Sequence, residues 1–188
     1  VGGWFTSAGG MAANYIAKWN GAYWEALGSG VNSGVDALVV SGTNLYAGGS
    51  FTVAGGISAK AVAKWNGSSW SNLGTGGAGL GDYDSFPTVR ALAVSGNNLY
   101  VGGSFNNAGG NAAYGVARWN GSYWNAMGDT VIWDGETVNA VVVSGNDVYA
   151  GANDYFGINL MKWNGSSWTN LGTGVDNWVS ALAVSSGN

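Results

Sequence analysis

The sequence has no cysteine and no histidine among its 188 residues. The absence of cysteine excludes disulfide bonds. The absence of histidine removes the commonest general base, the Ser-His and Cys-His nucleophile systems, and imidazole ligands for zinc. We therefore expect a protein that is not an enzyme and that needs no cofactor.

Charge is also scarce, at 9% of the residues, with six Lys and Arg against ten Asp and Glu. The basic residues are spread along the chain, so they cannot form the clustered basic face that nucleic-acid binding requires. There is no run of 18 apolar residues and only one proline. These features argue against membrane insertion and a collagen-like structure. No signal peptide is visible, because Val1 already lies inside a repeat, and we expect a mature or excised piece.

Glycine and tryptophan are abundant, with 35 and 11 residues, and they recur with a period. The stretch KWNGSSW at 64–70 returns at 162–168, as RWNGSYW at 118–124, and as KWNGAYW at 18–24. Four Trp-Asn pairs anchor the repeats, and their spacings are 46, 54 and 44 residues: Trp19, Trp65, Trp119 and Trp163.

Each repeat begins with an apolar run, which we call strand one: 35–40, 89–94, 138–143 and 179–184. After it come a turn and a second run, such as LYVGGSF at 99–105. The repeat then continues with a loop, a strand ending in KWN or RWN, and a short last strand. Four short β-runs with a period of about 45 residues are typical of propeller blades. A β-sandwich is a weaker alternative, since it would not require this repetition.

We therefore predict one all-β domain over 1–188, a β-propeller of four four-stranded blades. The C-terminal strand at 179–184 would close the ring by pairing with the N-terminal blade, which would leave no open sheet edge. The Trp-Asn spacing across that join would be 44 residues, equal to the shortest internal gap. The join lacks only the Leu-Tyr pair of the other repeats. The alternatives are a four-unit part of a longer array and half of a two-chain ring.

The stretch LYVGGSFNNAGGNAAYGVARWNGSYWNAMG at 99–128 resembles kelch-related repeats of large secreted and cell-surface proteins. Such repeats occur in fungal cortical-polarity markers and bacterial extracellular proteins. The third unit departs from the pattern, since AGANDYFGINLMKWN at 150–164 lacks the second glycine and the AGG loop. The resemblance implies an extracellular, non-catalytic propeller, and it implies no ligand and no shared functional residues.

The repeated WNGxxW stretch is expected to be a hairpin. If Gly67 and Ser68 are the central turn residues, Trp65 faces Trp70 and Val62 faces Leu73, and all four repeats gain an apolar pair. A turn centred on Asn66 and Gly67 would instead place Val62 opposite Ser71. We prefer the first register, which makes the tryptophans structural rather than a sugar-stacking surface. The Asn-Gly-Ser triplets remain glycosylation candidates: Asn66, Asn120 and Asn164.

Acidic and aromatic residues gather in the variable links between repeats, where function is more often located than in uniform turns. We expect ligand-binding residues there: Tyr83, Asp84, Trp133, Asp134, Glu136 and Trp178. Asp82 and Asp84 are a weak calcium candidate, because no further ligand series follows them. Asp134 and Glu136 could form a glycosidase pair only if they were held about 5–10 Å apart around a cleft.

The second residue of strand one is polar in every repeat, although the strand is otherwise almost entirely apolar. Strand one is the innermost strand of a propeller blade, so we expect these side chains at the mouth of the central channel: Asp36, Arg90, Asn139 and Ser180. Ordinary solvation of that mouth would also explain them.

Two functions follow from these patterns. The first is a secreted propeller that binds carbohydrate or another cell-surface ligand through its variable-loop face. The alternative is a structural subunit of an extracellular fibre, surface layer or adhesin stalk, in which an unclosed blade accepts a strand from the next subunit.

Overall fold

The described part of the chain consists of β-strands and their connections, as predicted for an all-β protein. The structure is a computed structural model, and it describes residues 1–74, 79–81, 86–128, 136–153, 157, 159–172 and 174–185. Over these ranges it has no helix long and apolar enough to cross a membrane.

Three repeats each form one antiparallel four-stranded sheet in which strands adjacent in the repeat are hydrogen-bonded neighbours. The first sheet contains β5 (Val35–Ser41), β6 (Asn44–Gly49), β9 (Val62–Trp65) and β10 (Trp70–Asn72). The second sheet contains β12 (Thr88–Ser95), β13 (Asn98–Ser104), β16 (Val116–Trp119) and β17 (Trp124–Ala126). The third sheet contains β18 (Thr137–Ser144), β19 (Asp147–Asn153), β20 (Leu160–Trp163) and β21 (Trp168–Asn170).

The N-terminal repeat forms a smaller sheet, which we call the N-terminal sheet. It pairs β3 (Ala17–Trp19) with β4 (Trp24–Ala26), and Gly2 forms a β-bridge with Ile16. Residues 1–3 thus lie where the second strand lies in the other sheets, since Gly48 pairs with Val62 in the same way. Within the described residues no strand occupies the strand-one position of this sheet.

Short hairpins form from the Ala-Gly-Gly loops of three repeats. They are β1 (Ser7–Ala8) with β2 (Met11–Ala12), β7 (Val53–Ala54) with β8 (Ile57–Ser58), and β14 (Asn107–Ala108) with β15 (Asn111–Ala112), which β11 (Leu80–Gly81) joins. Each hairpin packs on the second tryptophan of its repeat. A Cβ on Gly55, for example, would lie only 2.8 Å from the Trp70 side chain.

The preferred hairpin register is confirmed in all four repeats. Trp65 pairs with Trp70, and the matching tryptophan pairs form in the other three repeats. The Trp65 and Trp70 rings lie 5.4 Å apart between centroids. Gly67 adopts φ +101°, a conformation that favours glycine, and Asn66 Oδ1 accepts hydrogen bonds from the backbone N–H groups of Ser68 and Ser69.

Successive sheets pack through a glycine of the second strand. A Cβ on Gly48 would lie 2.4 Å from Val89 of β12, so only glycine lets the strands approach this closely. Gly102 meets Val138 and Val141 of the third sheet in the same manner. The result is a series of apolar layers between neighbouring sheets, the largest of which contains Leu99 and Val101.

In three repeats the second tryptophan also joins its sheet to the preceding one. Its indole Nε1–H donates to a backbone carbonyl at the end of the preceding repeat: Trp70 to Leu27 at 2.8 Å, Trp124 to Leu73 at 3.0 Å, and Trp168 to Met127 at 2.6 Å. This bond between repeats gives the second tryptophan a structural role beyond its pairing within the hairpin.

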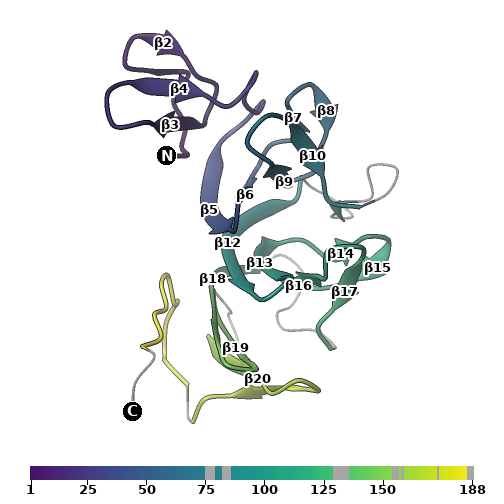
Figure 1. The fold of residues 1–188 in the computed structure, drawn as a ribbon. Helices are drawn as coiled ribbons and strands as arrows, with labels where there is room; N and C mark the ends of the chain where they lie inside the picture. Colours follow the sequence, from purple (N-terminus) through teal and green to yellow (C-terminus); the bar gives the residue numbers. More distant parts are fainter. Residues whose placement is uncertain are drawn as a thin grey trace.

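The sheets follow one another along an open arc, with β5, β12 and β18 on its concave side (Figure 1). Residues 179–185, which we call the C-terminal segment, lie beside the third sheet, where Val179 N donates to Ala152 O at 3.0 Å. Val35 N donates to Gly3 O in the same way between the N-terminal and first sheets. The C-terminal segment therefore takes a strand-one position following the third sheet.

The predicted ring closure is not formed in this structure. The C-terminal segment and the N-terminal sheet lie at opposite ends of the arc, and the segment pairs with none of the described strands (Figure 1). Val179 and Leu182 pack on Gly151 of the third sheet as Val89 and Leu92 pack on Gly48, so the segment extends the arc at that end. The arc does not curve far enough to bring the N-terminal sheet to it.

Candidate functional site

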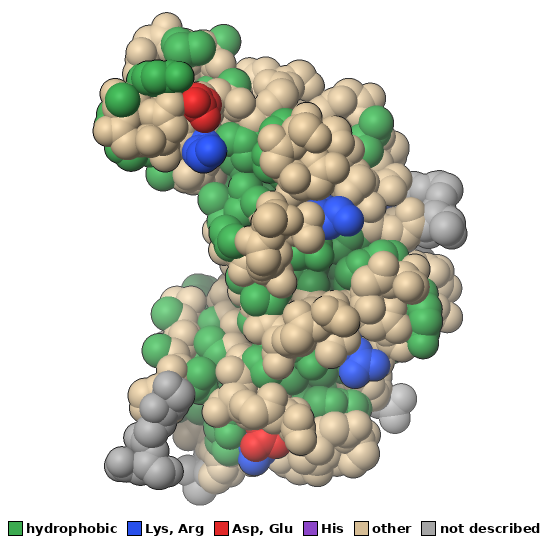
Figure 2. Space-filling model, viewed as in Figure 1, with side chains coloured by type: hydrophobic (Ala, Val, Ile, Leu, Met, Phe, Trp, Pro, Cys, Tyr) green, Lys and Arg blue, Asp and Glu red, His purple; other side chains and the backbone are tan. Residues whose placement is uncertain are grey.

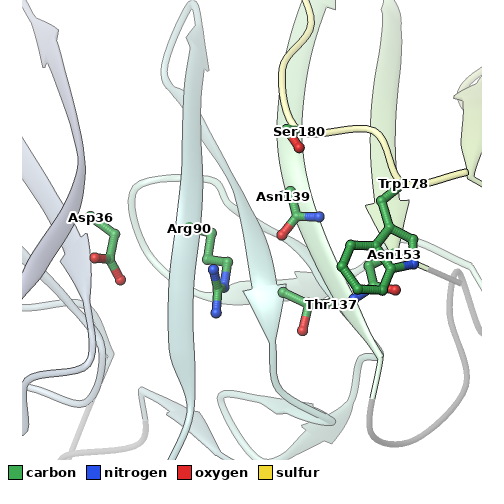
Figure 3. A pocket seen from close by; sticks show the side chains of 7 residues that line it. All are labelled: Asp36, Arg90, Thr137, Asn139, Asn153, Trp178 and Ser180. Carbon is green, nitrogen blue, oxygen red and sulfur yellow. The ribbon is translucent and has the colours of Figure 1, made fainter.

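A polar pocket of about 530 Å³ lies on the concave side of the arc (Figure 3). Neighbouring strands supply its walls: Asp36 from β5, Arg90 from β12, Thr137 and Asn139 from β18, Asn153 from β19, and Trp178 and Ser180 from the chain beyond the third sheet. The structure therefore brings together all four polar strand-one residues that the sequence singled out, and Trp178 joins them.

A β-bulge places each polar residue of β5, β12 and β18 in this pocket. The strand pairing shifts between Val35 and Ala37, between Val89 and Ala91, and between Val138 and Ala140. The residue inside each shift is the polar one. A bulge leaves one residue unpaired and redirects its side chain. The polar side chain can therefore lie in the pocket although the valine that precedes it in the strand is buried.

The pocket combines both charge signs with amide and hydroxyl groups. Asp36 and Arg90 are exposed, and neither forms an ion pair within the described residues. Asn139 is half-buried, and its Nδ2 donates to Val179 O at 3.4 Å, which ties β18 to the C-terminal segment. The Asp36 carboxylate can only accept hydrogen bonds and the Arg90 guanidinium can only donate them, whereas the amide and hydroxyl groups of the pocket can do both.

Asn153 carries a buried side-chain oxygen, Oδ1, that has no hydrogen-bond partner within the described residues. A buried acceptor left unpaired costs about 1–3 kcal/mol. Sequence reasoning missed Asn153 and Thr137 as pocket residues. A signal for Asn153 existed, because the other two complete repeats have Ser50 and Ser104 at this position.

Trp178 provides the aromatic surface of the pocket. Its side chain is 59% exposed, and its backbone N–H donates to Asn177 Oδ1 at 2.8 Å. Figure 3 shows the indole beside Asn153 at one end of the group.

The other predicted link residues do not join this pocket. Glu136 is buried, with 6% of its surface exposed, and does not line it. The remaining candidates lie outside the described residues: Asp82, Tyr83, Asp84, Trp133 and Asp134. Their ligand, calcium and glycosidase assignments therefore remain predictions. In the described ranges no group of three acidic residues is arranged to hold a metal ion.

The three candidate glycosylation sites lie on the WNGxxW turns. Asn66 and Asn164 are exposed, whereas Asn120 is half-buried. In each case Oδ1 accepts backbone hydrogen bonds from the turn. The asparagines therefore have a structural role whether or not they are modified.

No family model matches the chain. No curated protein matches it either. Among solved structures, the chain is similar to a computationally designed protein called Ika8, with 18% sequence identity and a TM-score of 0.52. The match covers 84% of this chain and 42% of that one, so this chain spans less than half of that chain's length. At this identity the likeness concerns the fold alone.

Proposed function

We propose that the chain is a propeller section that binds carbohydrate in the polar pocket and does not catalyse a reaction. The propeller assignment is supported by antiparallel four-stranded sheets that repeat along an arc, with strand one of each on the concave side. The kelch-like repeat pattern favours an extracellular setting, in which a glycan or another surface ligand would be the partner.

The composition of the pocket carries the assignment to carbohydrate. A sugar ring presents hydroxyl groups, which both donate and accept, and apolar C–H faces. Asp36 can accept hydrogen bonds from sugar hydroxyls, Asn139 and Ser180 can both accept and donate them, and Arg90 can donate them. Trp178 supplies a flat apolar surface in the same pocket.

The unpaired Asn153 Oδ1 is consistent with such a ligand, since a sugar hydroxyl could donate to it. The atom is buried, so the ligand would have to displace what covers it. Trp178 lines the same pocket and is 59% exposed, so its indole is accessible to the same ligand.

A glycan array followed by calorimetric titration tests the proposal. For a glycan that binds, Trp178→Ala should weaken affinity about tenfold, equivalent to about 1.4 kcal/mol. The matched control is Trp4→Ala, because Trp4 is 70% exposed and lies outside the pocket. Binding of no glycan, or equal affinity of the parent and Trp178→Ala, would show the proposal to be wrong.

A second pair of variants tests the polar groups. Asp36→Asn should weaken binding of the same glycan. Asp176→Asn should not, because Asp176 is exposed outside the pocket. An equal effect of the two variants would indicate a general charge effect instead of a contact in the pocket.

A further inference from the structure

Neighbouring sheets within the chain are all joined by the same kind of contact. Each end of the arc carries one side of that contact without its partner, and the two sides are complementary. We propose that a second copy of this chain fills them, so that two copies associate head to tail and close into one ring. The C-terminal segment of each copy would become strand one of the other copy's N-terminal sheet. Three separate features of the two ends lead to this inference.

The first feature is the apolar groove at the N-terminal sheet, with a volume of about 540 Å³. It lies between this sheet and the first sheet, where Figure 2 shows hydrophobic side chains in a hollow. Val40 on its wall is 64% exposed, whereas the equivalent Val94 and Val143 pack against the apolar layers between complete sheets. The difference arises because, within the described residues, the N-terminal sheet has no strand one to cover Val40.

The C-terminal segment has the residues needed to fill that groove. Val179, Ala181 and Leu182 match Val35, Ala37 and Leu38 of β5 in sequence. In the first sheet these residues pair with Gly49, Gly48 and Ala47 of β6. The same register would pair the segment of the second copy with Gly3, Gly2 and Val1.

Ala183 of the second copy would then cover Val40. It occupies the position of Val39 and Ala93, and both of these pack against the sheet that follows their own. In the single chain Ala183 is exposed. The segment would not need to leave its place on the third sheet, because its contacts with Gly151 and Ala152 use other groups.

The second feature is an unmatched indole and carbonyl. Trp24 is the equivalent of Trp70, Trp124 and Trp168, yet within the described residues its Nε1–H donates to no acceptor. Leu171 is the equivalent of the carbonyl partner Leu27. Leu27 O accepts both Gly30 N and Trp70 Nε1, whereas Leu171 O accepts only Gly174 N within the described residues. Trp24 of one copy can therefore donate to Leu171 O of the other.

The third feature is an unmatched tryptophan and glycine. A Cβ on Gly128 would lie 2.7 Å from Trp163, and one on Gly28 would lie 3.4 Å from Trp65. The equivalent Gly172 has nothing within 4 Å, and the equivalent Trp19 is 51% exposed. Trp19 of one copy would cover Gly172 of the other in the same association.

The open arc and its length favour two copies over closure of one chain. The matched residues make up 84% of this chain and 42% of the designed protein, so that chain is twice as long as this one. The fold of this chain thus matches one part of a chain of about double its length. A head-to-tail contact between two different surfaces closes into a ring when its rotation permits.

Sedimentation velocity and light scattering over a range of protein concentrations test the proposal. The mass should reach twice the 19.1 kDa of one chain and rise no further. A single-chain mass at every concentration would mean that the chain stays open or closes on itself. A mass that continues to grow would mean open polymerisation. Either result would overturn the closed pair.

Two variants test the two surfaces of the proposed contact, one in the apolar groove and one in the C-terminal segment. Val40→Asp and Ala183→Asp should each weaken association about tenfold or more, because each places an unpaired carboxylate in an apolar contact. The matched control is Met11→Asp. Met11 is 55% exposed, and the equivalent Ile57 and Asn111 are also exposed although a sheet precedes them. Met11→Asp should associate like the parent.

Mixing the two variants provides the sharpest test. Val40→Asp retains an intact C-terminal segment and Ala183→Asp retains an intact groove, so the mixture should form a two-chain species that neither variant forms alone. A contact between identical surfaces would not be restored in this way. Failure of the mixture to associate, or undiminished association of either variant alone, would overturn the assignment.

A peptide with the sequence of residues 179–185, VSALAVS, gives a measurement that does not depend on the folding of a variant. Excess peptide should occupy the groove and convert the two-chain species to single chains. A scrambled peptide of the same composition should leave it intact. Equal effects of the two peptides would overturn the proposed occupant of the groove.

Discussion

Replacement of Trp70 by phenylalanine should measure the indole bond between repeats. Trp70 is buried, and its Nε1–H donates to Leu27 O at 2.8 Å. Leu27 O keeps its second donor, Gly30 N, so the loss of this bond should cost about 1 kcal/mol. Phenylalanine also buries about 40 Å² less surface, which adds about 1 kcal/mol. We expect Trp70→Phe to lower the free energy of unfolding by about 2 kcal/mol.

The matched variant is Trp24→Phe, measured at a concentration where single chains predominate. The Trp19–Trp24 rings have the same 5.4 Å centroid separation as Trp65–Trp70, but Trp24 is only half-buried and its Nε1–H has no acceptor within the described residues. Its loss should cost about 1 kcal/mol or less. Urea unfolding followed by far-UV circular dichroism measures both. Equal destabilisation by the two variants would refute the role assigned to the indole bond.

Three further predictions concern other parts of the arc. Gly102→Ala should destabilise by about 1–3 kcal/mol, because its Cβ would lie 2.6 Å from Val141, whereas Gly81→Ala meets its nearest atom at 3.4 Å; thermal unfolding compares them. Asp147→Asn removes the 2.7 Å contact with Lys162 Nζ and should lower stability only slightly, and by less at high salt, because both side chains are about one-third exposed and solvent screens the pair. The hydrogen bond to Asp147 raises the pKa of Lys162 above 10.5. The pair's contribution to folding stability should therefore be present at neutral pH and disappear as the pH rises through that raised pKa. NMR titration of Lys162 Nζ should show a lower pKa in Asp147→Asn. Burial raises the pKa of Tyr46 above 10.0, so Tyr46→Phe should remove absorbance from the late part of the alkaline tyrosine titration; loss from the early part would contradict this.

The repeat pattern made the local structure predictable. Trp65 faces Trp70 as expected, because four copies of the motif all had to satisfy one register. The polar second residue of an otherwise apolar strand one, repeated in every unit, likewise identified Asp36 and Arg90, which the structure brings into one pocket. Repetition therefore supplied the information that a single hairpin or strand would have lacked.

The relation between repeats was harder to predict. Nothing in the motif itself shows that Trp70 Nε1 bonds to Leu27, because that contact spans 43 residues and depends on how two sheets pack. Ring closure depends on the angle between successive sheets, and small differences in that angle accumulate along the chain. The bulges at Asp36 and Arg90 were also not foreseen, because strand one is apolar on both faces and has no alternation that a one-residue shift would interrupt.

The glycines at the sheet contacts have a consequence for the shape of the whole array. Gly48 and Gly102 make each layer thin near the concave side, while the tryptophan pairs make it thick toward the outer strands. Each repeat is therefore a wedge, and the taper of the wedge sets the curvature. Larger residues at these glycines would reduce the taper, widen the arc, and increase the number of repeats needed to complete one turn.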